Sequence, residues 1–179
     1  MALRNILPES DSTLTKKSRE ITEFGKRLHI LLDDMRETLI QANGLGLAAP
    51  QVGVLRRAAL VVDTGIESED INDQIIELVN PVIINNTGEQ TGTEGCLSVP
   101  GVYGIVTRPN SVEIRAKDRF GKDFIYSGDE LLARALCHEI DHLNGQLFTK
   151  IAERFLTEEE LEEMRKKREA GVSETGESE

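Results

Sequence analysis

The chain has no tryptophan, and phenylalanine and tyrosine together make up only 4% of its 179 residues. A core that lacks large aromatic rings must be built from Leu, Ile, Val and Ala. Only two cysteines are present, which excludes the disulfide-dense scaffold of small secreted domains. No apolar run approaches the roughly 20 residues that a transmembrane helix needs, so we expect no membrane partner. The remaining class is a globular chain of single-domain size.

Positive charge is also scarce, because 21 Lys and Arg residues stand against 32 Asp and Glu residues, for a formal net charge of −11. This balance disfavours broad binding to phosphate backbones, and we expect no DNA partner. Residues Met1–Asn5 contain no apolar signal core, so we expect a cytoplasmic protein. The acidic excess is concentrated in Thr157–Glu179.

Two of the three histidines lie in one short motif, His-Glu-x-x-His, at residues 138–142. The surrounding segment Asp129–Gly145 has a helical pattern, with acids near its start and a glycine at its end. On a helix, His138 and His142 lie one turn apart on the same face and can bind one metal ion. Glu139 is rotated by about 100° from His138, so it can reach a water on the metal without binding the metal itself.

The alternative for this motif is an ordinary helix without a metal. Leu131, Ala135, His138 and His142 share one helix face, so we expect the histidines to point inward with the apolar side chains. Inward histidines without a metal would need other hydrogen-bond partners. The motif therefore favours a metal-dependent hydrolase.

The rest of the chain alternates between helical and strand-like patterns. The predicted elements are a helix over Thr22–Ala42, strands over Ala58–Asp63, Glu77–Asn85 (with a bulge or edge at Pro81), Ser111–Ala116 and Asp123–Tyr126, the histidine helix, and a helix over Glu158–Glu169 capped by Thr157. Residues 66–74 are predicted to be a loop, and residues 171–179 to be disordered. This order predicts an α+β fold in which antiparallel or mixed β-sheets pack around a central metal-bearing helix, with an N-terminal and a C-terminal helix.

A catalytic metal needs a third protein ligand. The candidates are Cys96, Cys137, His29 and a distant carboxylate. Cys137 points about 100° away from its neighbour His138, and His29 lies on the apolar stripe of the first helix. Cys96 lies in an extended segment punctuated by Gly and Pro, which can bring a thiolate and backbone N–H groups to the metal. Cys96 is therefore the leading candidate, although a lone cysteine is usually a buried apolar residue.

The glycine-rich segment Gly44–Gly53 allows three interpretations. Its Gly-x-Gly-x-x-Ala pattern resembles a dinucleotide-binding fingerprint, with Asp63 as the ribose ligand. A helix precedes this segment, however, whereas the fingerprint requires a strand there. Glycines here can let another backbone approach closely, such as an extended peptide that pairs as an added strand. Gln51 offers an amide donor for a developing oxyanion, and a tight turn without any chemistry is the third interpretation.

Three motifs of this sequence together resemble the peptide deformylase family. They are Gly-Leu-Gly-Leu-Ala-Ala-Pro-Gln at residues 44–51, Glu-Gly-Cys-Leu-Ser at 94–98 and His-Glu-Ile-Asp-His at 138–142, in the family's order. The resemblance runs from about residue 3 to about residue 155. It implies a catalytic domain over residues 1–156, followed by an acidic C-terminal helix and flexible tail over residues 157–179.

The resemblance implies that the chain removes the N-formyl group from the N-terminal methionine of newly made polypeptides and releases formate. It implies one Fe²⁺ ion as cofactor, although two imidazoles and a thiolate would also suit Zn²⁺, Ni²⁺ or Co²⁺. The implied roles are metal ligation by Cys96, His138 and His142, general acid/base catalysis by Glu139, oxyanion stabilisation by Gln51 and the Leu97 backbone N–H, and substrate binding by Gly44, Leu45, Gly46 and Gly95.

Several neighbouring residues complete the expected site. We expect Glu94 and Asp141 to orient the histidines or to pair with Arg108. An apolar pocket for the methionine side chain is expected between Leu45, Leu97 and the His138 side of the helix.

Two further expectations concern the contacts beyond the formyl-methionine. Tyr103 is at a position where some relatives carry an arginine near the peptide. In some relatives the C-terminal helix docks on the ribosome. Docking to ribosomal RNA through the basic patch Arg165–Arg168 is a hypothesis for this acidic segment.

Two alternative functions remain. The first is a His-Glu-x-x-His peptidase that cuts internal peptide bonds, but such enzymes usually take a carboxylate or a histidine as third ligand. The second is a non-enzymatic metal-binding module, which would need four protein ligands. The sequence shows no evident fourth Cys or His ligand for such a site.

Overall fold

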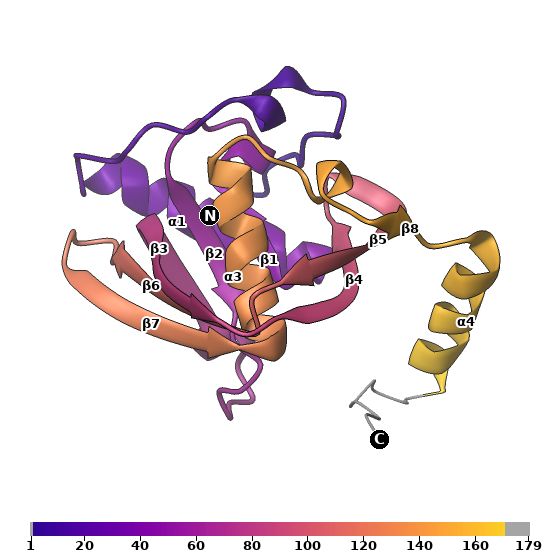
Figure 1. The fold of residues 1–179 in the computed structure, drawn as a ribbon. Coiled ribbons are helices and arrows are strands. Elements are labelled where there is room, and N and C mark those ends of the chain that lie inside the picture. Colours follow the sequence, from indigo (N-terminus) through magenta and orange to yellow (C-terminus); the bar gives the residue numbers. More distant parts are fainter. Residues whose placement is uncertain (1, 171–179) are drawn as a thin grey trace.

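The computed structural model describes residues 2–170, which form two β-sheets with one helix, α3, between them (Figure 1). The elements in chain order are η1 (Ser12–Thr15), α1 (Lys26–Ala42), β1 (Gly46–Ala48), η2 (Ala49–Val52), β2 (Ala58–Val62), α2 (Ile71–Gln74), β3 (Ile75–Thr87), β4 (Gln90–Cys96), β5 (Val99–Arg108), β6 (Ser111–Lys117), β7 (Asp123–Asp129), α3 (Glu130–Leu143), η3 (Phe148–Lys150), β8 (Arg154–Phe155) and α4 (Glu158–Glu169). The predicted disorder of residues 171–179 lies outside the described part of the chain.

The larger sheet has the strand order β1-β2-β3-β6-β7, and the smaller sheet has the order β4-β5-β8. All these neighbouring strands pair antiparallel, and neither sheet closes into a barrel. This arrangement confirms the predicted α+β fold with sheets around a central helix. Because β1 and β4 are both edge strands, each leaves one backbone edge unpaired by its own sheet.

Helix α1 covers one face of the larger sheet. Its apolar stripe is buried against β1 and β2, and it contributes Leu28, Leu31, Leu32, Met35 and Leu39 to the main core. The helix begins at Lys26 rather than at the predicted Thr22, because Gly25 takes an extended N-cap conformation. It ends as predicted at Ala42, where the next residue has a left-handed φ of 51°.

Helix α3 covers the opposite face and joins the two sheets. Ala133, Leu136 and Ile140 pack against the larger sheet in a second core cluster. The predicted apolar face is therefore partly wrong, because Leu131 is half exposed and borders a cavity with His138. The helix ends before Gly145, whose φ of +76° and contact with the Thr15 backbone leave no room for a side chain.

The predicted strands are confirmed at their centres. Two predictions are incomplete, one for the loop over residues 66–74 and one for the segment around Cys96. The predicted bulge at Pro81 is confirmed by a register shift between Val79 and Val82 within one continuous strand, β3. The predicted loop over residues 66–74 ends in the short helix α2. The hairpin of β4 and β5 was predicted only as an extended segment around Cys96, because β4 is rich in Gly and Thr and shows no apolar alternation.

Helix α4 has the predicted bounds, and Thr157 forms a capping box with Glu160. The helix has no buried residue and stands apart from the rest of the fold in Figure 1. None of the helices in residues 2–170 is both long enough and apolar enough to cross a bilayer.

Glu77 on β3 ties two distant segments to the larger sheet. Arg36 of α1 and Arg119, in the turn between β6 and β7, both donate hydrogen bonds to its carboxylate. Burial alone would raise the pKa of Glu77, but these hydrogen bonds outweigh it and lower the pKa below its usual value of 4.5.

We therefore expect Glu77 to contribute to acid sensitivity. A carboxylate with a lowered native pKa stabilises the fold above its unfolded pKa, and this contribution is lost as the pH falls from about 4.5 through the native pKa. Urea unfolding between pH 7 and pH 3 should show a smaller loss of stability in Glu77→Gln than in the unmodified protein. The control is Glu113→Gln, since Glu113 makes no ion pair within residues 2–170; an equal loss in Glu77→Gln and the unmodified protein would contradict the assignment.

Candidate active site

Three potential metal ligands, one sulfur and two imidazole nitrogens, converge between the two sheets. Cys96 Sγ lies 3.3 Å from His142 Nε2, which lies 3.2 Å from His138 Nε2. Cys96 ends β4, whereas His138 and His142 are one turn apart on α3. The structure therefore brings together the three residues that the sequence predicts as ligands, and His142 is almost fully buried.

The spacing of these atoms fits a metal ion. Donor atoms on one tetrahedral ion lie about 3.3–3.6 Å apart, given metal–nitrogen bonds of about 2.0–2.1 Å and metal–sulfur bonds of about 2.3 Å. Burial alone would lower the pKa of His138, but Cys96, Glu94 and Glu139 raise it to about 10. Burial and His138 together hold the pKa of His142 well below its usual value, so this ring stays neutral. The cluster thus attracts positive charge and offers a neutral imidazole, which suits a divalent cation.

Glu94 orients His138 from the smaller sheet. Its Oε2 accepts a hydrogen bond of 2.9 Å from His138 Nδ1, which leaves Nε2 of that ring to face Cys96 and His142. Burial alone would raise the pKa of Glu94, but hydrogen bonds from His138 and Arg108 lower it to about 2. The carboxylate is therefore ionised over the whole range in which the protein would work.

Two arginines surround this buried carboxylate. Arg108 donates two hydrogen bonds to Glu94, at 2.7 and 3.0 Å, and a third to Asp141 at 2.6 Å. Arg134 of α3 donates another to Glu94 at 3.0 Å. The structure thus confirms that Glu94 orients a histidine and that Asp141 pairs with Arg108. The role of Arg134 was missed, although its position four residues before His138 on the helix was a usable signal.

Glu139 is the second buried carboxylate, and its environment differs from that of Glu94. Its Oε2 has no hydrogen-bond partner within the described residues, and burial raises its pKa to about 7. The chain passes this carboxylate at Gly46 of β1, where any Cβ would overlap it. A buried carboxyl group with a pKa near neutrality and a free oxygen can both accept and return a proton.

Gln51 presents its amide to the donor cluster in one fixed orientation. Its Oε1 accepts a hydrogen bond of 2.8 Å from the Ala48 backbone N–H, so the amide nitrogen must face the other way. That nitrogen donates to Ser98 Oγ at 3.2 Å and lies 3.5 Å from Cys96 Sγ. Ser98 is buried and was not predicted as a site residue, although it belongs to the same short motif as Cys96.

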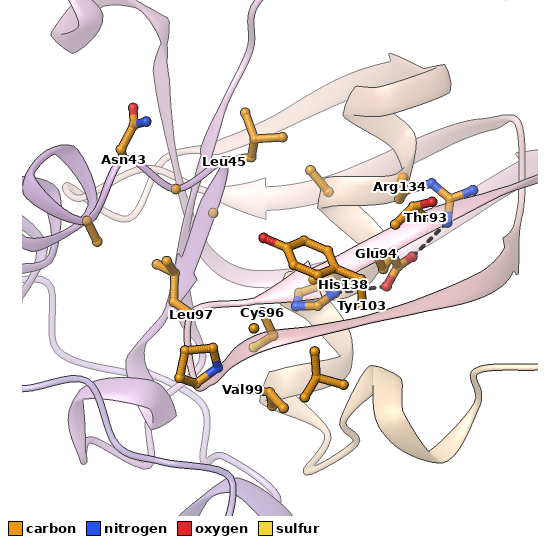
Figure 2. Close-up of a pocket in the computed structure, with 18 of the residues that line it drawn as sticks. Asn43, Leu45, Thr93, Glu94, Cys96, Leu97, Val99, Tyr103, Arg134 and His138 are labelled. Carbon is orange, nitrogen blue, oxygen red and sulfur yellow. Dashed lines mark hydrogen bonds and ion pairs between the residues drawn. The ribbon is translucent and has the colours of Figure 1, made fainter. Parts of the chain in front are cut away.

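A cavity of about 760 Å³ opens beside the cluster. Its walls include Leu45, Leu97 and His138, the residues expected to line an apolar pocket (Figure 2). The backbone N–H of Val62 donates to the Leu45 carbonyl, so the alternation of an antiparallel pair turns the N–H and C=O of Gly46 away from β2, toward the free edge. An extended chain could add to this edge.

The other predicted substrate glycines also permit close contacts within the chain. A Cβ at Gly44 would lie 2.8 Å from the Leu97 side chain, and one at Gly95 would lie 2.6 Å from the Tyr103 ring. Tyr103 lines the cavity, as Figure 2 shows. Glycine at these positions thus keeps the walls close together, in addition to any contact with a substrate.

The dinucleotide-binding alternative is wrong for this segment. Helix α1 precedes β1 and only the short η2 follows it, so no strand leads into a glycine-rich turn and a long helix. Asp63 instead accepts a hydrogen bond from the Tyr126 hydroxyl. Of the other ligand candidates, Cys137 is buried in the core, where burial raises its pKa to about 11, and His29 bonds to the Arg119 carbonyl. Among the described residues, no carboxylate joins the group of Cys96, His138 and His142.

Comparisons with known proteins agree with this geometry. The sequence model of the polypeptide deformylase family matches residues 3–156. A peptide deformylase of Caldicellulosiruptor bescii is 52% identical over 165 residues, which cover 92% of this chain and 95% of that protein. One from Thermoanaerobacter pseudethanolicus is 47% identical, over 92% of this chain and 99% of that protein. The crystal structure of a peptide deformylase from Legionella pneumophila matches with a TM-score of 0.78 at 40% identity, over 95% of each chain.

These matches define the α+β protein as a hydrolase. The chain belongs to the peptide deformylase family, whose members are metal-dependent. The alternative of a His-Glu-x-x-His peptidase finds no support in them.

We expect the Glu94 carboxylate to be essential for both stability and the orientation of His138. Glu94→Ala would leave the buried guanidinium groups of Arg108 and Arg134 without their main partner, which should cost about 3–5 kcal/mol in the free energy of unfolding. Urea denaturation measures this loss, and metal titration should show an affinity about 10–100-fold lower. The control is Glu89→Ala, which changes an exposed residue just before the same hairpin and should alter the free energy of unfolding by less than about 0.5 kcal/mol. A similarly small change in the free energy of unfolding of Glu94→Ala would refute the role of Glu94.

Proposed function

We propose that this protein hydrolyses the N-formyl group of formyl-methionyl polypeptides and releases formate, with one divalent metal ion, Fe²⁺ by family resemblance, held by Cys96, His138 and His142. The substrates would be newly made chains in the cytoplasm. The division into a catalytic part, residues 1–156, and a C-terminal segment, residues 157–179, is part of the proposal. It is supported by the family match, which ends at residue 156.

One observation carries the proposal. The ligand atoms of Cys96, His138 and His142 lie within 4.8 Å of one another, next to the buried carboxylate of Glu139, whose Oε2 has no hydrogen-bond partner within the described residues. Within residues 2–170 this group offers three donors of the kind that bind metals, which leaves the fourth position of a tetrahedral ion for solvent or substrate. A closed structural site would need a fourth protein ligand, so this observation opposes the non-enzymatic module.

The proposed mechanism assigns each step to a group of this chain. A divalent metal at the cluster would supply Lewis-acid chemistry and make a water acidic at neutral pH. Glu139 takes a proton from the attacking water, whose oxygen adds to the formyl carbon. The Gln51 amide and the Leu97 backbone N–H donate to the carbonyl oxygen as it gains negative charge. Glu139 then passes the proton to the leaving amine, the carbon–nitrogen bond breaks, and formate departs.

The free edge of β1 supports the choice of a peptide substrate. An extended peptide can pair with the backbone of Gly46 while its first side chain enters the apolar part of the cavity near Leu45 and Leu97. Gly44 and Gly95 would keep the two walls close enough for both to touch a single extended chain. The reacting end then lies between Glu139 and the donor cluster.

The function is tested by measuring metal content together with formate release from formyl-Met-Ala-Ser. We expect about one metal ion per chain, loss of turnover after chelation, and recovery with Fe²⁺ under anaerobic conditions. Acetyl-Met-Ala-Ser and unblocked Met-Ala-Ser are the controls and should remain intact. Cleavage of internal peptide bonds without formate release would instead support the peptidase.

The role of Glu139 has its own test. Glu139→Ala should retain the metal, because none of the three ligands is changed, but kcat should fall by about 10²–10⁴-fold because no other group moves the proton. Metal analysis of the purified variant and formate release give the two readouts. Turnover near that of the unmodified protein would remove Glu139 from the mechanism.

A further inference from the structure

Helix α4 stands apart from the fold, yet one of its faces borders the substrate cavity. Its connection runs through β8, and Arg154 pairs with Glu160 at its first turn. Met164, Lys167 and Arg168 line the same cavity as Cys96 and His138. These three residues are spaced i, i+3 and i+4, so they share one helix face.

The charges on the cavity wall are unevenly distributed between its interior and its surface. The lining residues Glu94, Arg134 and Glu139 are charged but buried. Lys167 and Arg168 are the two exposed charged residues of the lining within residues 2–170, and both are cationic. In a chain of net charge −11, a cavity whose exposed charge is positive is unexpected.

Bases in the last turn of a helix also have a plain structural explanation, because they stabilise the negative end of the helix dipole. Lys166 satisfies that explanation equally well, but it lies with Arg165 over a different hollow, between α4 and Gly101. The four bases of α4 are thus divided between two hollows. The dipole explains why they lie at this end of the helix, but it does not explain why two of them face the substrate cavity.

We propose that α4 is an outer wall of the substrate cavity and that Lys167 and Arg168 bind acidic side chains of the peptide downstream of the formyl-methionine. This inference rests on the proposed function, because it concerns the part of the same substrate that leaves the cavity. An extended chain advances about 3.3 Å per residue, so several downstream residues must pass the cavity wall. Met164 adds an apolar contact on the same face.

An RNA surface is the rival use of these bases. Phosphate binding would draw on all four bases of α4 together, but these bases are divided between two hollows, and Glu158, Glu162 and Glu169 border the hollow of Arg165 and Lys166, where they would repel a phosphate backbone. The cavity side of the helix carries the two bases without an acid among the lining residues of α4. The observations therefore favour an acidic peptide.

The test compares three amidated hexapeptides that begin with formyl-Met-Ala-Ser and continue with Asp, Ser or Lys at the last three positions. The full chain should show the highest kcat/KM for the Asp peptide and the lowest for the Lys peptide, with about a 3- to 10-fold span for two exposed ion pairs. The net charge of the protein would favour the opposite order. The ratio of kcat/KM between the Asp peptide and the Lys peptide should fall in 0.5 M salt, because salt screens exposed charges.

Two double variants separate a local contact from a change in net charge. In Lys167→Ala/Arg168→Ala, the ranking of the three peptides by kcat/KM should disappear or reverse. In Arg165→Ala/Lys166→Ala, which changes the charge of the same helix by the same amount, the ranking should remain. Alanine preserves helix propensity, and far-UV circular dichroism checks the helix in both.

Each result of these experiments has one meaning. Equal effects of the two variants, or no peptide order in the unmodified protein, would overturn the α4 proposal while turnover of the Ser peptide upholds the function. Failure to deformylate any peptide would instead refute the proposed function. Loss of ribosome co-sedimentation in Lys167→Ala/Arg168→Ala with an unchanged peptide order would show an RNA surface and overturn the peptide-binding role.

Discussion

The arrangement of the site depends on one buried carboxylate, Glu94, and on the positive groups that keep it ionised. Burying a charge is costly, and here two arginines and a histidine ring from two different elements offset that cost. The same hydrogen bonds join the smaller sheet to α3 and set which nitrogen of His138 faces Cys96. The hydrogen bonds to Glu94 therefore both hold the smaller sheet against α3 and orient the proposed ligand His138.

A second constraint is the close packing at two glycines that line the cavity. Gly46 and Gly95 lie against the side chains of Glu139 and Tyr103, so a larger residue at either glycine would move a wall of the cavity. The edge strands β1 and β4 both line this cavity. A hydrolase of extended peptides benefits from this design, because unpaired strand edges bind a backbone and leave the side chains to the cavity.

The C-terminal helix differs from the rest of the site in its energetics. The charges of the interior are paired and desolvated, so they hold the geometry, whereas the bases of α4 are exposed and contribute weakly per contact. The family match ends at residue 156, just before this helix. Exposed residues of α4 can be substituted without disturbing the proton transfer assigned to Glu139. Substitutions there can therefore change the preference among peptides while the chemistry is kept.

The sequence by itself determined the features that depend on local spacing. His138 and His142 converge because they are one turn apart, and α4 begins after Thr157 because its cap is local. Only the tertiary structure decided the pairing of β4 with β5, the arrival of Cys96 at α3 and the ion pairs of Arg134. These contacts join segments that are far apart in the chain, and neither residue periodicity nor capping signals specify which distant partner a buried charge or an edge strand will meet.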